Sequence, residues 1–126
     1  MTQASTSNSI ILIVEDEYLV RMSAAAMMED AGFNVLEAGN ADEAIRLLES
    51  HSDISIVFTD IEMPGSMNGL KLAHAVIGRW PPIRVIATSG RFRLREGDLP
   101  TGGRFLAKPY SAGQILGALR DMGAAA

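Results

Sequence analysis

The chain has 126 residues, a length that suits one domain and is too short for two. It is 48% hydrophobic and 21% charged, which is typical of a globular protein, and without cysteines it can form neither disulfides nor thiolate metal sites. The net charge of -4 argues against direct DNA binding, because phosphate contacts need a clustered basic surface.

Both ends of the chain are predicted to be flexible, at residues 1–8 and 124–126, which leaves one domain over residues 9–123. Residues 1–8 are small and polar and lack the basic and apolar regions of a signal peptide. No stretch of the sequence approaches the roughly 18 apolar residues of a membrane span. We therefore expect a cytoplasmic protein without membrane contact.

The first elements alternate between strand and helix. The continuous apolar run Ile10–Val14 predicts a strand that is buried on both faces. Residues Glu17–Ala31 place apolar side chains at helical spacing and stop before Gly32, a residue that favours the position after a helix. A second short strand is predicted at Asn34–Ala38.

The same alternation continues through the middle of the chain. Asn40 and Glu43 have the spacing of a capping box, which begins a helix with an apolar face. The residues of that face are Ala41, Ala44, Ile45 and Leu48. A third buried strand is predicted at Ile54–Thr59, and it leads directly into Asp60.

Two further strands and two helices complete the pattern. A helix is predicted over Asn68–Arg79, where it ends before two prolines, and the fourth strand over Ile83–Thr88. A short fifth strand is expected at Phe105–Ala107, and Ser111 with Gln114 has the spacing that begins a last helix. Strands that alternate with helices predict an α/β fold with a parallel sheet and helices on both faces.

One segment interrupts the alternation. Residues Arg91–Gly103 contain three glycines and one proline and show no sustained helical stripe. A regular unit would place the fourth helix there, so we predict that this helix is short, frayed or absent.

The polar residues of the sequence gather where the predicted strands end. The first strand ends at Glu15 and Asp16, the third at Asp60, the fourth at Thr88-Ser89-Gly90 and the fifth at Lys108-Pro109. In an open parallel sheet, ligands bind beyond the carboxyl ends of the strands. We therefore expect three carboxylates, one or two hydroxyls and one ammonium group at a single edge.

This set of groups favours phosphoryl transfer with a hard divalent cation. Three clustered carboxylates repel one another, so either their pKa values rise or a cation neutralises them. Oxygen ligands alone suit Mg²⁺. A carboxylate nucleophile, a metal and cationic and hydroxyl donors are the parts that the chemistry requires. Asp60 is the candidate nucleophile, with Lys108 and Ser89 as donors to the transferred group.

Four segments are distinctive in their order and spacing: ILIVEDE (Ile11–Glu17), VFTDIEMPGSMNGLKL (Val57–Leu72), VIATSG (Val85–Gly90) and FLAKPY (Phe105–Tyr110). Through them the chain resembles the CheY-like receiver domain of response regulators over nearly its full length. The resemblance implies a doubly wound, flavodoxin-like parallel sheet of five strands in the order 2-1-3-4-5. Gly90 and the irregular segment after it also resemble the receiver subgroup nicknamed FAT GUY, which tends to have a degenerate fourth helix.

The resemblance also implies a metal site and a phosphoacceptor. Glu15 and Asp16 form the acidic pair, with Asp16 the closer ligand of Mg²⁺ or Mn²⁺. Asp60 is then a metal ligand and the residue phosphorylated by a histidine kinase or a histidine phosphotransfer protein. The backbone carbonyl of Glu62 becomes a further metal ligand.

A second group of residues is implied to sense the phosphoryl group. Ser89 is our candidate for the switch hydroxyl, with Thr88 as the alternative, and Lys108 binds a phosphoryl oxygen. Phe105 lies where the family keeps a switch aromatic, and the bond before Pro109 is expected to be cis.

Glu62 and Arg91 each follow a site residue by two positions, after Asp60 and Ser89 respectively. Similar positions in receivers tune how long the phosphoryl group lasts. We predict that the two side chains approach each other at the mouth of the site and restrict the access of water.

The expected function is that of a single-domain signalling receiver rather than a conventional enzyme. Its signal would leave by protein contact, or the domain would drain phosphate from a kinase. The alternatives are a receiver cut from a hybrid histidine kinase and a small phosphatase with an aspartyl-phosphate intermediate. A flavin binder of the same architecture is disfavoured, because Glu15 and Asp16 would repel a phosphate where such proteins cradle one.

Overall fold

The computed structural model describes residues 9–63, 68–90, 99 and 103–124. Within them the chain forms one parallel sheet of five strands in the order β2-β1-β3-β4-β5. The strands are β1 (Ile10–Val14), β2 (Asn34–Ala38), β3 (Ile54–Asp60), β4 (Arg84–Ser89) and β5 (Arg104–Ala107). This confirms the predicted fold class and strand order, and each predicted strand lies within one residue of its observed bounds.

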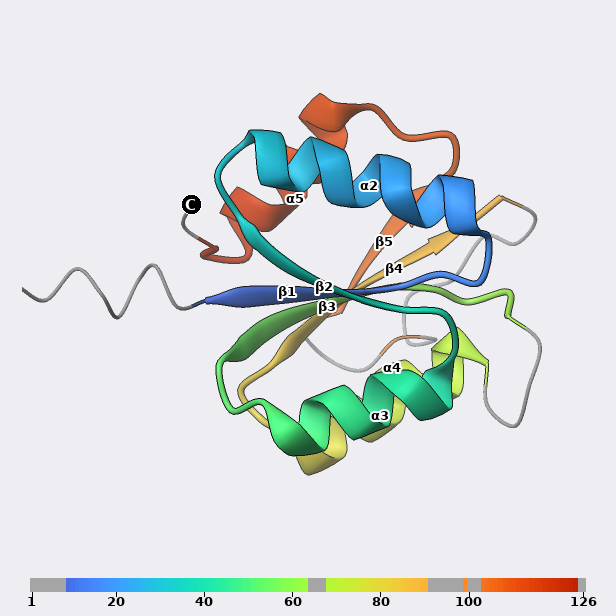
Figure 1. Cartoon of the computed structure of the whole chain (residues 1–126), viewed down its shortest axis with the longest axis vertical. Helices are drawn as coiled ribbons and strands as arrows, with labels where there is room; N and C mark the ends of the chain where they lie inside the picture. The colour runs from blue at the N-terminus through green and yellow to red at the C-terminus, as the bar shows by residue number, and fades with distance from the viewer. Residues whose placement is uncertain (1–8, 64–67, 91–98, 100–102, 125–126) are drawn as a thin grey trace, which may run out of the picture.

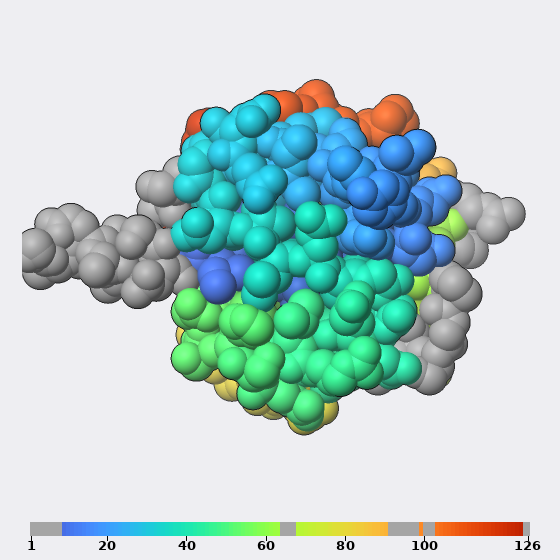
Figure 2. Space-filling view, viewed as in Figure 1, coloured from blue at the N-terminus to red at the C-terminus, as the bar shows by residue number. Residues whose placement is uncertain are grey.

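Helices cover both faces of the sheet. They are α2 (Tyr18–Asp30), α3 (Ala41–Ser50), α4 (Gly69–Arg79) and α5 (Ala112–Asp121). Figure 1 shows α2 and α5 on one face and α3 and α4 on the other. In the space-filling view, α2 and α3 lie above and below the edge of the sheet and leave little of β1 visible between them (Figure 2).

The core is divided by the sheet into two apolar layers. Alternate residues of β1 point to opposite faces, so Leu12 and Val14 pack with α3 and α4, whereas Ile11 and Ile13 pack with α2 and α5. All four side chains are almost completely buried. A strand that is buried on both faces explains why β1 reads as a continuous apolar run in the sequence.

The register of the strands brings their carboxyl ends together. Val14 of β1 pairs with Thr59 of β3, Asp60 pairs with Thr88 of β4, and Ser89 pairs with Ala107 of β5. The residues that follow β1, β3 and β5 therefore lie at one edge of the sheet, on the side toward which the strand arrows point in Figure 1.

Helix caps match the sequence at two positions, with one change of partner. Ser111 and Gln114 form a full capping box at the start of α5. At α3, the Asn40 side chain accepts a hydrogen bond from Glu43 N, but the Glu43 carboxylate accepts from Gly39 N at 2.6 Å. The reciprocal half of this box thus reaches one residue further back than expected, and still satisfies a backbone N–H at the helix entrance.

The prediction of a short or absent fourth helix falls mainly on residues outside the described part of the chain. Residues 91–98 and 100–102 belong to this group, as do the two ends at 1–8 and 125–126. In the described residues, β4 is followed along the chain by β5 as the next element. None of the helices in the described residues combines the length and the apolar character that a membrane crossing requires.

Candidate functional site

Asp60 ends β3 and is held firmly at the carboxyl edge of the sheet. Its residue is only 5% exposed. Oδ1 of Asp60 accepts a hydrogen bond from Glu62 N at 2.9 Å, and Oδ2 accepts one from Lys108 Nζ at 3.1 Å. The hydroxyl of Thr59 donates to the backbone oxygen of Asp60 at 3.0 Å. A buried carboxylate with partners on both oxygens has a fixed orientation, which is what a nucleophile requires.

Gly69 presses against the backbone of Asp60 where α4 begins. A methyl group on Gly69 would overlap the carbonyl oxygen of Asp60 and crowd its carbonyl carbon and the Cα atom of Ile61. The absence of a side chain here lets the start of α4 touch the end of β3. The Asn68 side chain caps the same helix by accepting from Lys71 N at 2.9 Å.

Glu15, the first residue after β1, is fixed at four points. Its residue is only 4% exposed. Oε1 accepts from Lys108 Nζ at 3.0 Å and Oε2 accepts from Glu17 N at 3.1 Å. The backbone N–H donates to Ala38 O at 3.0 Å, and the backbone oxygen accepts from Nη1 of Arg21 at 2.9 Å.

The three predicted acidic ligands meet at one place. Carboxylate oxygens of Glu15, Asp16 and Asp60 lie within 4.8 Å of one another, with Glu15 and Asp60 buried and Asp16 exposed. An all-oxygen set with one side open to water fits Mg²⁺, which keeps several waters and takes one or two carboxylates. The donor set therefore fits the metal that the sequence predicts.

Lys108 places its ammonium group between two buried carboxylates. Burial alone would lower the pKa of Lys108, but its hydrogen bonds with Glu15 and Asp60 raise that pKa above its ordinary value. Burial raises the pKa of Glu15, although the hydrogen bond from Lys108 works in the opposite direction. Lys108 is therefore a permanent cation at neutral pH, and it neutralises part of the acidic cluster.

Ser89 and Thr88 end β4 with different surroundings. Oγ of Ser89 donates to Oε1 of Glu62 at 2.6 Å, which links Ser89 to the residue that contacts Asp60. Neighbouring residues of a strand point to opposite faces, so Thr88, although buried, points away from Ser89. This arrangement favours Ser89 over Thr88 as the hydroxyl that serves the site.

The remaining predicted site residues are Phe105, Pro109 and Arg91, and the structure describes the first two. Phe105 is half-buried on β5 and pairs with Ala87 of β4. The peptide bond between Lys108 and Pro109 is cis. Arg91 lies outside the described residues, so its predicted approach to Glu62 remains a prediction.

Arg21 was not found by sequence reasoning. Besides its bond to the Glu15 carbonyl, its Nε atom lies 3.2 Å from Oε1 of Glu37, and its guanidinium stacks 5.4 Å from the ring of Tyr18. Arg21 thus joins α2 to the ends of β1 and β2. Nothing in the sequence signals this role, because a charged residue on a helix is most often exposed to solvent.

An apolar groove borders the site beside Lys108. It has a volume of about 550 Å³, and α2 and the segment after β5 form its walls. The lining residues are Leu19, Val20, Ser23, Met27, Gly90, Lys108, Pro109 and Tyr110. Leu19 is 77% exposed, and Tyr18 and Met22 are exposed beside it.

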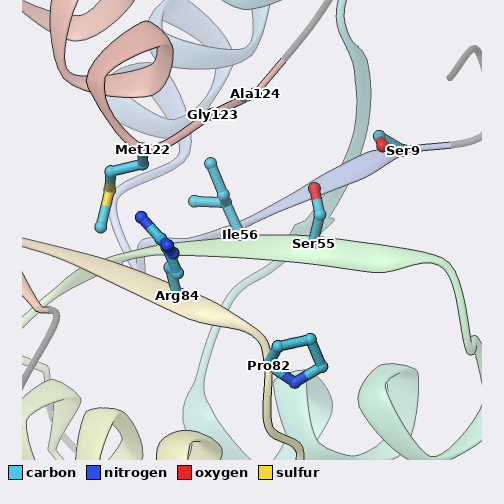
Figure 3. Close-up of a pocket in the computed structure, with 8 residues that line it drawn as sticks. All are labelled: Ser9, Ser55, Ile56, Pro82, Arg84, Met122, Gly123 and Ala124. Carbon is cyan, nitrogen blue, oxygen red and sulfur yellow. The ribbon is translucent and has the colours of Figure 1, made fainter.

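A smaller hollow of about 160 Å³ lies at the opposite edge of the sheet (Figure 3). The described residues that line it include no carboxylate, imidazole or thiol. The Arg84 side chain points from β4 toward the segment after α5, as Figure 3 shows. The hollow therefore offers no candidate chemistry.

Comparison with known proteins agrees with this geometry. Residues 11–120 match the family model described as the response regulator receiver domain. The transcriptional regulatory protein PdtaR of Mycobacterium tuberculosis is 33% identical over 112 residues, which cover 86% of this chain and 54% of PdtaR. The sensor kinase CckA of Brucella abortus is 31% identical over 93% of this chain and 13% of the kinase.

Solved structures show the same fold. The crystal structure of a response regulator receiver protein from Sinorhizobium medicae superposes with a TM-score of 0.84 at 25% identity, covering 90% of this chain and 93% of that one. The chain spans about half the length of PdtaR and a much smaller part of CckA. The match to these two longer proteins is therefore a match to part of each.

Proposed function

Because the chain belongs to the response regulator receiver domain family, we propose that it accepts a phosphoryl group on Asp60 in a Mg²⁺-dependent reaction. The observation that carries this proposal is the position of Asp60, buried between the Lys108 ammonium group and two further carboxylates. A nucleophile with a fixed cation on one side and a metal-binding cluster on the other suits phosphoryl transfer.

Glu15, Asp16 and Asp60 are the side chains that would hold Mg²⁺ or Mn²⁺, together with the backbone carbonyl of Glu62. When bound, the metal neutralises the negative charge that gathers between the donor phosphate and the acidic residues. An oxygen of Asp60 forms the new bond to phosphorus as the bond to the donor imidazole breaks. Glu15 keeps its orientation through Lys108 and Glu17 N.

Lys108 and Ser89 then bind the oxygens of the phosphoryl group on Asp60. Lys108 turns its ammonium from the Asp60 carboxylate to a phosphoryl oxygen, and Ser89, or in its place Thr88, donates to another. Phe105 changes its side-chain position as Ser89 moves, so that phosphorylation shifts the population between two surfaces.

Glu62 and Arg91 are proposed to shield the phosphoryl group from water. Support comes from the Glu62 carboxylate, which contacts the Ser89 hydroxyl and Gly90 N at the end of β4. Replacing both Glu62 and Arg91 by alanine should shorten the phosphoryl lifetime, and an unchanged lifetime would show that the pair has no such role.

The donor is proposed to be a histidine kinase or a histidine phosphotransfer protein in the cytoplasm. Exposed apolar side chains on α2 beside the site, among them Tyr18, Leu19 and Met22, support a protein partner. The domain then signals by protein contact or acts as a phosphate sink, and it is a phosphoacceptor rather than a conventional enzyme.

The test is an intact-mass measurement after incubation with Mg²⁺ and acetyl phosphate, beside an Asp60→Asn control. We expect a gain of about 80 Da that the control lacks. A protein that binds Mg²⁺ but gains no mass, and that also fails to bind beryllofluoride, would contradict the proposal.

A further inference from the structure

Four residues beside Asp60 Oδ1 and the end of β4, namely Asp60, Glu62, Ser89 and Gly90, are joined by hydrogen bonds. Glu62 N donates to Oδ1 of Asp60 at 2.9 Å. The carboxylate of the same residue accepts at Oε1 from the Ser89 hydroxyl at 2.6 Å and from Gly90 N at 3.0 Å. The distance of 2.6 Å is typical of a hydroxyl that donates to a carboxylate, and bonds of this kind are about twice as strong as those between neutral groups.

The Ser89 hydroxyl has one proton, and Glu62 uses it. A hydroxyl donates a single hydrogen bond, so donation to Glu62 and donation to a phosphoryl oxygen on Asp60 exclude each other. The backbone of Ser89 is fixed separately, because its carbonyl accepts from Lys108 N at 2.9 Å and the residue is only 2% exposed. Rotation of the Ser89 side chain can therefore change the partner of the hydroxyl while the backbone stays in place.

Charge on Asp60 opposes the bond between Ser89 and Glu62. Phosphorylation replaces the single negative charge of the Asp60 carboxylate by close to two on the phosphoryl group at neutral pH, a gain of about one. The backbone N–H of Glu62 donates to Oδ1 of Asp60, so the Glu62 carboxylate belongs to a residue that lies directly beside the phosphoryl position. Like charges at this separation repel, which weakens the position of the Glu62 carboxylate at the moment when Ser89 gains a new acceptor.

We propose that Glu62 is a latch, a positioning residue that holds the Ser89 hydroxyl away from Asp60 until an anion on Asp60 displaces it. This inference rests on the proposed function of Asp60, and it adds a competitor for the switch hydroxyl within the unphosphorylated protein. Breaking the bond between Glu62 and Ser89 costs free energy, so the latch weakens the binding of a phosphoryl group or its analogue at Asp60.

A simpler effect, repulsion between Glu62 and any anion at the site, must be separated from the latch. The two differ in whether Ser89 is needed. Repulsion acts on the anion directly and is the same whether position 89 is serine or alanine. A latch acts through the hydroxyl, so its effect disappears when the hydroxyl is removed.

The first experiment uses the whole chain without metal or fluoride. Urea unfolding is measured for the unmodified protein, Glu62→Ala, Ser89→Ala and the double variant. If the bond exists in the free protein, the double variant should unfold at nearly the same urea concentration as either single variant. A shift in the double variant equal to the sum of the two single shifts would overturn the latch.

The second experiment measures beryllofluoride binding in the presence of Mg²⁺ for the same four proteins, by fluorine NMR or calorimetry. Glu62→Ala should tighten binding by about fivefold when Ser89 is present and by less than about twofold in the Ser89→Ala protein. Equal factors in both backgrounds would show repulsion alone and would overturn the latch.

Glu62→Gln separates charge from hydrogen bonding. It keeps an oxygen acceptor for Ser89 but loses the charge that an anion repels, so its affinity for beryllofluoride should lie between those of the unmodified protein and Glu62→Ala. If the unmodified protein bound no beryllofluoride, the function proposed for Asp60 would fail, and the urea experiment would still decide whether Glu62 holds Ser89.

Discussion

The backbone of Gly69 at the start of α4 lies directly against the carbonyl group of Asp60 at the end of β3. Replacing Gly69 by alanine would drive a methyl group into that carbonyl, and the neighbour is backbone that cannot rotate away. We expect Gly69→Ala to lower the free energy of unfolding by about 1–3 kcal/mol through overpacking. It should also slow phosphorylation by acetyl phosphate, because Asp60 is displaced.

Gly117→Ala is the matched control for this substitution. Gly117 lies inside α5, and a methyl group there would meet nothing within 4 Å. Alanine in a helix interior is favoured over glycine by about 0.5–1 kcal/mol, so this variant should be more stable than the unmodified protein. If urea unfolding showed the same change for both variants, the contact between Gly69 and Asp60 would not be the cause.

Replacing Lys108 by methionine should make the stability of the protein depend on bound Mg²⁺. Removing the ammonium group leaves Glu15 and Asp60 buried without a counter-charge, which costs up to about 3–5 kcal/mol for a buried pair. We expect a smaller loss here, because the Lys108 side chain is 20% exposed. The freed carboxylates should bind Mg²⁺ about tenfold more tightly, since a competing cation is gone.

Calorimetry with Mg²⁺ measures this affinity, and urea unfolding with and without Mg²⁺ measures the stability. Lys71→Met is the control, because Lys71 is an exposed lysine on α4. Equal Mg²⁺ affinity in the Lys108→Met and unmodified proteins would mean that Lys108 does not compete with the metal.

Arg21 is expected to hold the acidic pair in place. In Arg21→Ala the carbonyl of Glu15 loses its partner at the end of β1, which costs about 1–3 kcal/mol for a buried polar group. Glu37→Ala removes only the outer ion pair, and an exposed pair contributes about 1 kcal/mol or less. Mg²⁺ affinity should therefore fall in Arg21→Ala and stay close to normal in Glu37→Ala, whereas equal losses in both would assign the effect to the ion pair.

The strand ends show how much of the site the sequence could predict. Glu15 follows the buried strand β1, Asp60 ends the buried strand β3, and Lys108 follows the partly exposed strand β5. The carboxyl ends of parallel strands lie at the same edge of a sheet, so these residues meet there. Their meeting follows from topology alone. The bounds of β1 and β3 were predicted accurately because both strands are buried on both faces and therefore form continuous apolar runs in the sequence.

Contacts that depend on side-chain direction could not be predicted in this way. The bond of Glu62 with Ser89 depends on the direction in which the Glu62 carboxylate points. The bond of Arg21 with the Glu15 carbonyl depends in the same way on the direction of the arginine side chain. Both are long side chains with many rotamers, so sequence spacing does not restrict where their ends lie. The capping box predicted for Asn40 and Glu43 is only half formed for the same reason. The Glu43 side chain is long enough to accept from Gly39 N rather than from Asn40 N.

Tyr110 gives a prediction for alkaline pH. It follows Lys108 by two residues, and the centre of its ring lies 5.6 Å from that of Phe58 in an edge-to-face contact. Burial raises the pKa of Tyr110 above its ordinary value of 10.0, although the charge of Lys108 works in the opposite direction. A group whose pKa is raised by folding binds its proton more tightly in the folded state. Its contribution to stability is present below about pH 10 and is lost as the pH rises through the folded pKa.

Tyr110→Phe should therefore lose less stability than the unmodified protein between about pH 8 and about pH 11, when unfolding by urea is compared at the two values. Lys108 is present in both proteins, so its own titration cancels in the comparison. The tyrosinate absorbance supplies a second measurement, because the chain has two tyrosines and the difference between the two proteins isolates Tyr110. A midpoint at or below 10.0 for that difference, or equal pH dependence of unfolding, would show that the Tyr110 ring is not shielded from water in solution.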